Sequence, residues 1–116
     1  MRREEDRLRD ILEQVDLVLS AVHGKSRPWF DSEPLVQGAV QYALIVLGEA
    51  VSHVSEQLQL KYPEIPWKNI RRQRDLLAHQ YHKVDLDMIW QTASQDMLPL
   101  RTQIAEILKA EFPFSV

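Results

Sequence analysis

The chain has 116 residues, of which 45% are hydrophobic and 27% charged, a composition typical of one soluble globular domain over residues 1 to 116. Its formal net charge of −3 argues against a generally basic surface that binds any nucleic acid, so no DNA binding is expected. The absence of cysteine excludes disulfide frameworks, thiolate metal sites and thiol enzymes. No apolar run reaches the roughly 18 residues of a membrane span, and the first ten residues are charged where a signal peptide would turn apolar, so we expect a cytoplasmic protein that does not enter a membrane.

Apolar residues with helical spacing predict a first helix over residues 4 to 23. They are Leu8, Ile11, Leu12, Val15, Val18, Leu19 and Val22. Gly24 follows at the position of a left-handed C-terminal cap. Residues 25 to 32 contain a proline and no periodic pattern, and a loop is expected there.

A second helix is expected over about residues 33 to 62, with Asp31 or Ser32 as its cap. The pattern is apolar nearly all round between Ala39 and Val51, which is typical of the central helix of a domain.

Three residues of this central helix stand out against its apolar pattern. Glu49 is its one carboxylate between Glu33 and Glu56, and a buried carboxylate is costly without a partner. Gly38 and Gly48 each cost about 1 kcal/mol relative to alanine in a helix, which indicates that a neighbouring element comes close there.

Two prolines interrupt the chain before a third helix, expected over about residues 66 to 82 with Pro66 in its first turn. Asp85 is expected to cap a fourth helix, and Pro99 to kink it or to separate it from a fifth segment at about residues 100 to 112. The sequence therefore predicts an all-α protein, an up-and-down bundle of four to five helices with short connections.

The third helix carries the string R-x4-H-x-Y, from Arg74 through His79 to Tyr81. Arg74 occupies a seam of otherwise apolar and aromatic residues, so its guanidinium needs a counter-charge. Two interpretations remain open: a structural ion pair with Glu49, or a cavity in which the guanidinium meets a phosphate. On an ideal helix Tyr81 lies within about 20° of Arg74 and His79 about 140° away, which favours a site completed by a second subunit.

A histidine and an arginine suit RNA cleavage by the ribose 2′-hydroxyl, which needs no metal or other cofactor. The histidine transfers the proton and the arginine neutralises charge on the phosphate. One histidine per motif supplies either the base or the acid, and a symmetric homodimer would supply both. An alternative is a metal pair of His79 and His82 with Asp75 as third ligand.

Basic residues surround the string, with five cations and one acid between residues 68 and 83, a local excess of four positive charges. This excess indicates a focused anion site, although a solvated basic face would give the same pattern. The residues expected to bind RNA are Lys68, Arg71, Arg72 and Lys83.

Several segments together resemble the HEPN superfamily, in particular the HepT-like ribonuclease toxins of prokaryotic toxin-antitoxin pairs. They are residues 7 to 12, Leu47-Gly48-Glu49-Ala50, Ile65-Pro66-Trp67, the string from Arg74 to Tyr81, Val84-Asp85 and Ile89-Trp90. The resemblance implies a dimer in which Arg74 and His79 form a metal-independent endoribonuclease site that yields a 2′,3′-cyclic phosphate. Asp75, where asparagine is common in the family, would help to orient the site, with Glu49 in support.

The resemblance also implies a type VII-like toxin-antitoxin system, in which a minimal nucleotidyltransferase antitoxin transfers AMP to Tyr81. The AMP phosphates would occupy the place of an RNA phosphate beside Arg74. Two other functions remain: a non-catalytic module that binds RNA, a nucleotide or a protein, and a purely structural helical protein.

Overall fold

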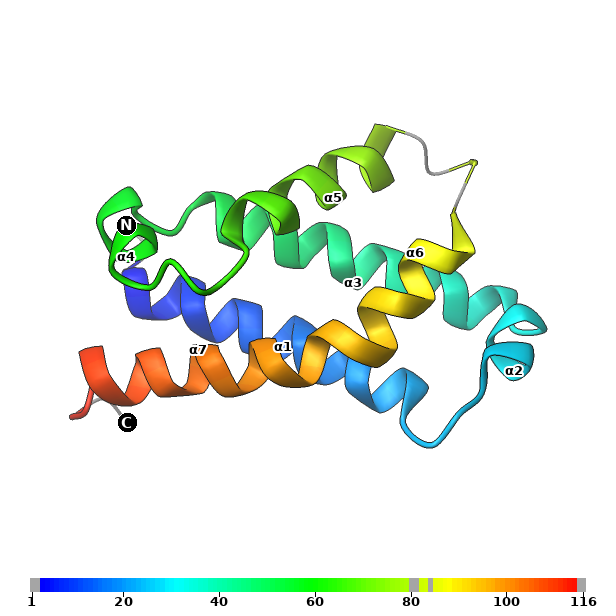
Figure 1. The fold of residues 1–116 in the computed structure, drawn as a ribbon, viewed down its shortest axis with the longest axis horizontal. Helices are drawn as coiled ribbons and strands as arrows, with labels where there is room; N and C mark the ends of the chain where they lie inside the picture. Colours follow the sequence, from blue (N-terminus) through cyan, green and yellow to red (C-terminus); the bar gives the residue numbers. More distant parts are fainter. Residues whose placement is uncertain (1–2, 80–81, 84, 115–116) are drawn as a thin grey trace.

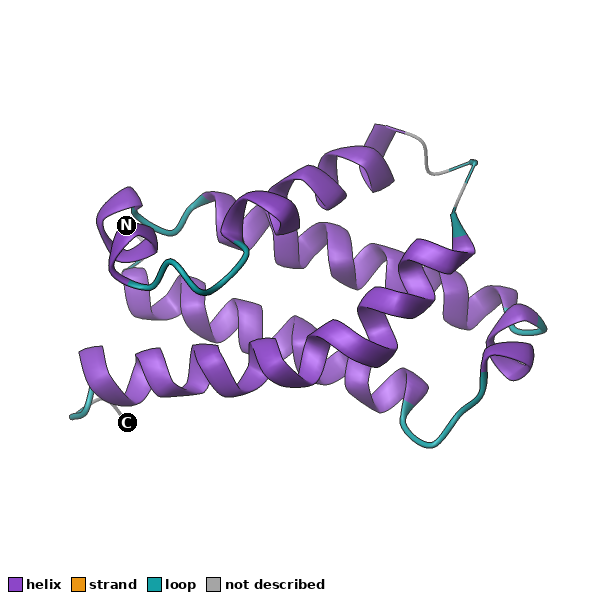
Figure 2. Ribbon diagram, in the orientation of Figure 1, coloured by secondary structure: helices purple, strands orange, loops and turns teal. Residues whose placement is uncertain are grey.

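The computed structural model describes residues 3–79, 82–83 and 85–114, and these residues form helices and connections with no strand among them. Four long helices run alternately up and down (Figure 1): α1 (Glu4–Val22), α3 (Pro34–Ser52), α5 (Trp67–His79) and α7 (Met97–Glu111). Shorter segments join them (Figure 2): α2 (Arg27–Asp31), α4 (Glu56–Lys61), α6 (Leu86–Gln91) and the π-helix η1 (Thr92–Asp96). The predicted all-α, up-and-down bundle is confirmed.

Helix α3 is the central helix, packed against α1 on one side and α5 on the other, while α7 packs against α1. By length and composition alone α3 could cross a membrane, which the sequence pattern did not indicate. The core helix of a globular protein meets the same two criteria, and α3 buries seven residues in the bundle.

Helix α1 matches its predicted range, and Gly24 takes the left-handed conformation expected of the cap, with φ of 70°. The predicted loop at residues 25 to 32 is wrong, because α2 forms there. The hydroxyl of Ser26 accepts a hydrogen bond from the Trp29 N–H at 3.3 Å, and Arg27 pairs with Asp31 at 2.7 Å one turn later.

The predicted central helix starts at Pro34, within one residue of its expected start, but its expected cap and its expected end are wrong. Its N-terminal cap is Glu33 rather than Asp31 or Ser32, and it stops at Ser52 instead of running to residue 62. A new helix, α4, starts because the Ser55 hydroxyl accepts from the Leu58 N–H at 3.1 Å. The Glu4 carboxylate also accepts bonds from the Ser55 backbone N–H and hydroxyl, which ties this break to the start of α1.

The predicted third helix starts at Trp67, one residue after Pro66, and its last described residue is His79. The expected range to residue 82 is therefore too long, since His82 and Lys83 lie in a turn and a bend. Tyr81 lies outside the described residues. Asp85 caps α6 as predicted, with its carboxylate accepting from the Met88 N–H at 3.1 Å.

The predicted kink at Pro99 takes the form of the π-helix η1, directly upstream of α7. Proline has no N–H to bond the carbonyl four residues before it, so the backbone there is free to leave the α-helical pattern. Pro99 itself lies in the first turn of α7, and the chain stays helical through it.

Candidate active site on helix α5

Helix α5 approaches α3 most closely where Gly48 faces Arg74. A Cβ on Gly48 would overlap the Cβ of Arg74, lie 2.7 Å from its Cγ and lie 3.3 Å from the carbonyl oxygen of Ile70. Glycine is therefore required here, as predicted. The same prediction is wrong for Gly38, because nothing lies within 4 Å of a Cβ at that position.

Two carboxylates hold the guanidinium of Arg74. Its Nη1 donates to Oδ1 of Asp75 at 2.7 Å, and its Nη2 donates to Oε2 of Glu49. These bonds, that of Asp75 first, raise the pKa of Arg74, and Arg74 is the main cause of a lowered pKa at Glu49. The side chains of Arg74 and Glu49 are 33% and 48% exposed, so the expected buried pair is instead an ion pair at the surface.

The exposure follows from the contact at Gly48. Because Gly48 has no side chain, the aliphatic part of Arg74 can pass over α3 at this point. The guanidinium then reaches the surface, where it pairs with Glu49 of α3. The ion-pair interpretation of Arg74 is thus realised in this structure, and the guanidinium is partly exposed to solvent.

His53 is a member of this cluster that the sequence analysis missed. It is the C-terminal cap of α3, and its Nε2 lies 3.2 Å from Oε1 of Glu49. This bond is the second cause of the lowered pKa of Glu49. The four-residue spacing of Glu49 and His53 on one helix was the signal that could have found it.

His79 lies on another side of α5 and is exposed. Its Nδ1 is 2.9 Å from the backbone oxygen of Asp75, and since a carbonyl oxygen can only accept, Nδ1 carries the proton and donates. In the neutral imidazole Nε2 then keeps its lone pair, as a general base requires. Asp75 therefore contacts both motif residues, Arg74 through its carboxylate and His79 through its carbonyl.

The basic residues predicted to bind RNA are spread around α5. Lys68 and Arg72 are exposed on the helix, and Lys83 is exposed in the bend after it. Arg71 is half-buried and donates to Oε1 of Gln59 at 2.7 Å. Arg72 lines a small hollow together with Asp75, Leu76 and His79.

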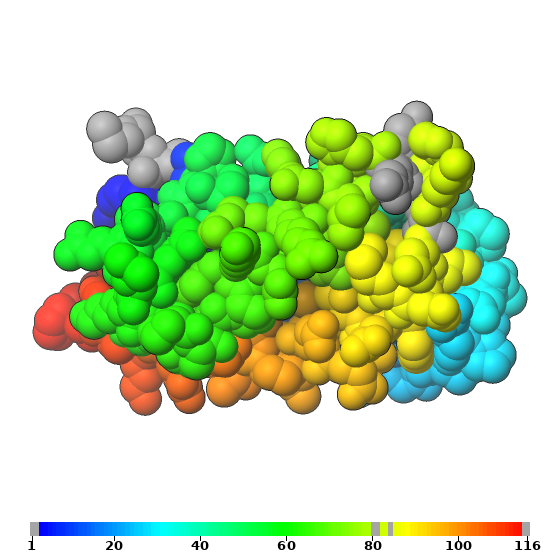
Figure 3. Space-filling model, turned by 45° about the horizontal axis from the view of Figure 1, so that its top comes forward, coloured from blue at the N-terminus to red at the C-terminus, as the bar shows by residue number. Residues whose placement is uncertain are grey.

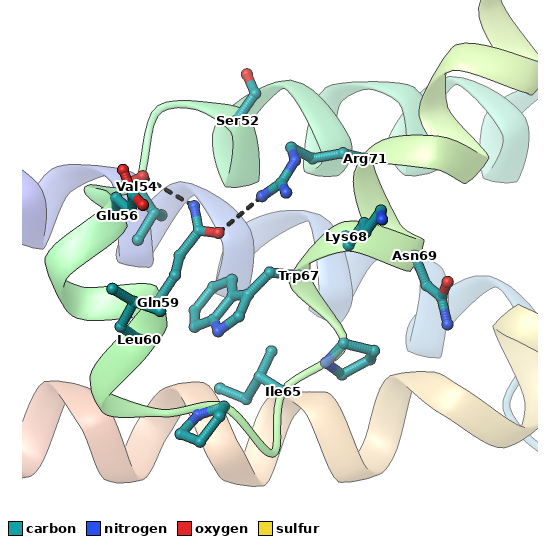
Figure 4. A pocket seen from close by; sticks show the side chains of 12 residues that line it. Ser52, Val54, Glu56, Gln59, Leu60, Ile65, Trp67, Lys68, Asn69 and Arg71 are labelled. Atoms are coloured by element: carbon teal, nitrogen blue, oxygen red, sulfur yellow. Dashed lines mark hydrogen bonds between the residues drawn. The ribbon is translucent and has the colours of Figure 1, made fainter.

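A larger hollow of about 800 Å³ lies at the start of α5, between α4 and the end of α3 (Figure 4). Arg71 enters it and is held by Gln59, whose own Nε2 donates to the Val54 oxygen at 2.9 Å. Its other polar lining residues are Ser52, Glu56, Lys68 and Asn69, and the ring of Trp67 lies beside Gln59. The hollow thus combines two cations, one carboxylate and apolar surface.

The alternative metal pair has no third ligand in the part of the chain that the structure describes, where no three His, Asp or Glu side chains form a group that could hold an ion. The described residues bring Arg74, Asp75, Glu49 and His53 together, and they place His79 on a neighbouring face.

The family model of ribonuclease HepT-like proteins matches residues 11–107. The chain belongs to the HepT-like ribonuclease family. It is 33% identical over 104 residues to "Putative RNase TTE0752" of Caldanaerobacter subterraneus subsp. tengcongensis, which covers 90% of this chain and 93% of that protein. It is 32% identical over 108 residues to "Probable ribonuclease HepT" of Thermococcus cleftensis, covering 93% and 98%.

A third relative of the HepT-like chain is "Putative RNase MJ1216" of Methanocaldococcus jannaschii, 33% identical over 102 residues, with 88% of this chain and 84% of that protein covered. No solved structure matches the chain. The resemblance to the HEPN superfamily is confirmed by the family match, and the names of the relatives point to RNA cleavage as the family's activity.

Proposed function

We propose that this protein is a metal-independent endoribonuclease that acts as a homodimer, with Arg74 and His79 as its catalytic residues. The observation that carries the proposal is the pair of contacts made by Asp75. One residue orients the guanidinium of Arg74 and fixes the tautomer of His79, so both groups are positioned before RNA binds.

In the proposed reaction Nε2 of His79 removes the proton of a ribose 2′-hydroxyl, and the 2′-oxygen attacks the adjacent phosphorus. The bond to the 5′-oxygen breaks, which leaves a 2′,3′-cyclic phosphate and a 5′-hydroxyl. Arg74 stabilises the charge that develops on the non-bridging oxygens. A second copy of His79 in the dimer protonates the leaving oxygen.

The outer face of α3 supports the dimer. It leaves Leu35 90% exposed and Tyr42 69% exposed, and on the neighbouring α1 Leu17 is 55% exposed. Large apolar side chains left open on adjacent helices are typical of a surface that a second subunit covers.

The decisive experiment is RNA cleavage by the purified protein in excess EDTA. We expect the wild type to cut and His79→Ala to lose cutting by at least about a hundredfold, since one acid–base group contributes 10²–10⁴-fold. His23→Ala, at the end of α1, is the control and keeps full activity. Equal cleavage by His79→Ala and wild type, with equal helical circular dichroism, would refute the assignment.

We also propose that the protein is the toxin of a type VII-like toxin-antitoxin pair in the cytoplasm. In this proposal a minimal nucleotidyltransferase antitoxin uses ATP: the phenol oxygen of Tyr81 attacks the α-phosphorus and pyrophosphate leaves. The support is the family resemblance. Intact mass after co-expression should rise by whole AMP units in wild type and stay unchanged in Tyr81→Phe.

A non-catalytic RNA-binding module is the second candidate, favoured by the basic residues around α5. It predicts salt-dependent RNA binding that is equal in wild type and His79→Ala, and no cleavage by either protein. The cleavage experiment above separates the two.

A further inference from the structure

A cleft of about 610 Å³ runs along the side of α5 that faces away from Arg74. It exists because α5 packs against α3 and stands apart from η1 and α7, which Figure 3 shows where the green-yellow surface of α5 meets the orange surface below it. Leu44 and Leu47 of α3 form its floor, and a hydrogen bond of 2.5 Å from Gln73 to the Thr92 hydroxyl crosses it.

The walls of the cleft combine apolar surface with polar edges. Met88 and Met97 offer polarisable thioethers, which pack well against aromatic rings. Asn69 and Gln103 have side-chain amides that bond to no other described residue, and Asp96 lies at the mouth with an accessible carboxylate. A planar heteroaromatic ring needs this combination, apolar contacts for its faces and hydrogen-bonding groups for its edge.

The cleft adjoins both of the hollows described above. Arg72 and Leu76 line the cleft and also the hollow of His79, and His79 follows Leu76 by three residues, about 4.5 Å along the helix. Pro66 and Asn69 line the cleft and also the hollow of Figure 4. A single strand with a phosphate at His79 can therefore place a neighbouring base in the cleft while Lys68 and Arg72 follow its backbone.

We infer that this cleft is a base-recognition site, which binds one unpaired nucleobase that carries an exocyclic amino group, and so prefers adenine, cytosine or guanine to uracil. The inference rests on the proposed function, because it takes RNA to be the substrate. The Asp96 carboxylate accepts from the amino group, and the free amides of Asn69 and Gln103 pair with the rest of the base edge.

Methionine methyl groups provide a direct probe, because Met88 and Met97 both line the cleft. The experiment uses methyl-13C methionine in the His79→Ala protein, so that RNA stays intact, and titrates it with uridine pentamers that carry one central adenine, cytosine, guanine or uracil. We expect the resonances of Met88 and Met97, assigned with Met88→Leu and Met97→Leu, to shift more with an amino base than with uracil.

The second arm replaces the proposed acceptor. Asp96→Ala should weaken binding of the adenine pentamer about tenfold and leave that of the uridine pentamer unchanged, whereas Glu106→Ala, exposed on α7, changes neither. A structural role of Asp96 would instead weaken both pentamers alike and overturn the inference.

Wild-type cleavage, measured in parallel, separates this inference from the proposed function. If the protein cleaves RNA while neither methionine responds to any pentamer, the base site is wrong and a side chain of a partner protein becomes the better occupant. If the methionines respond with the expected base preference and no RNA is cut, the base site stands and the ribonuclease proposal falls.

Discussion

Gly48 and Arg74 together fix the distance between α3 and α5, because the stem of the arginine fills the space that a Cβ on residue 48 would need. The closest overlap involves the Cβ of Arg74, which cannot move without the helix that carries it. A side chain at residue 48 would therefore push α5 away from α3 and displace the guanidinium from Glu49.

Gly48→Ala should destabilise the protein by about 1–3 kcal/mol, the usual cost of overpacking, and should lower RNA cleavage. Gly38→Ala is a matched control on the same helix, with open space at the Cβ, and should stabilise by about 0.5–1 kcal/mol. Chemical denaturation measures both. If Gly48→Ala and Gly38→Ala stabilised the protein equally, the close contact between Gly48 and Arg74 would be contradicted.

Acid stability should depend on Glu49, whose pKa is lowered by Arg74 and then by His53. A carboxyl with a lowered pKa in the folded state stabilises the fold above its ordinary pKa of about 4.3, and loses this contribution as the pH falls through the lowered value. Because the pair is exposed, the effect is small and decreases with salt.

The free energy of unfolding should thus fall less steeply below about pH 4.3 in Glu49→Gln than in wild type. Glu13→Gln, exposed on α1, serves as the control for a lost charge. If the free energy of unfolding depends on pH in the same way for wild type and Glu49→Gln, then Arg74 and His53 do not stabilise the Glu49 carboxylate.

Asp75→Asn should strengthen RNA binding about two- to fivefold at low ionic strength, because it removes a negative charge beside Arg74 and leaves the carbonyl that bonds His79. The gain should vanish in high salt. Asp16→Asn is the matched control, since Asp16 also accepts from an exposed arginine, Arg101, at 2.6 Å. If Asp75→Asn bound RNA more weakly than wild type at every salt concentration, the Asp75 carboxylate would contribute more by positioning Arg74 than it costs by repelling the RNA phosphates.

Ser55→Ala should destabilise the protein by about 1–2 kcal/mol, because the hydroxyl both caps α4 and bonds to Glu4. Ser94→Ala removes a hydroxyl that bonds only the Trp90 carbonyl within the helix and should be nearly neutral. Thermal melting of the two variants, compared with wild type, tests the difference.

Tyr42→Asp should convert the proposed dimer to a monomer and reduce RNA cleavage with it, since a charge would be placed on the exposed apolar face of α3. Leu98→Asp, at a residue 63% exposed on α7, should leave both mass and activity unchanged. Light scattering after gel filtration gives the mass. A wild-type protein that is monomeric at all concentrations would contradict the dimer.

The sequence predicted the helical class and the order of the long helices because their apolar spacing is regular. It misplaced the end of the central helix because the local capping signal of Ser55 was overlooked, and because Ser55 also bonds Glu4, a contact across 51 residues that no local pattern contains. The ion pair of Arg74 and Glu49 was one of two interpretations that the sequence left open. Its exposure was not, since that depends on how the Arg74 stem passes Gly48.

Helix α5 carries most of the candidate site yet buries only Trp67 and Leu77. Its exposed side chains contribute little to the free energy of folding, so substitutions there can alter the chemistry and the proposed RNA preference of this helix with little effect on the bundle beneath it. The same separation makes α5 a suitable segment for saturation mutagenesis, in which lost activity reports on RNA handling rather than on unfolding.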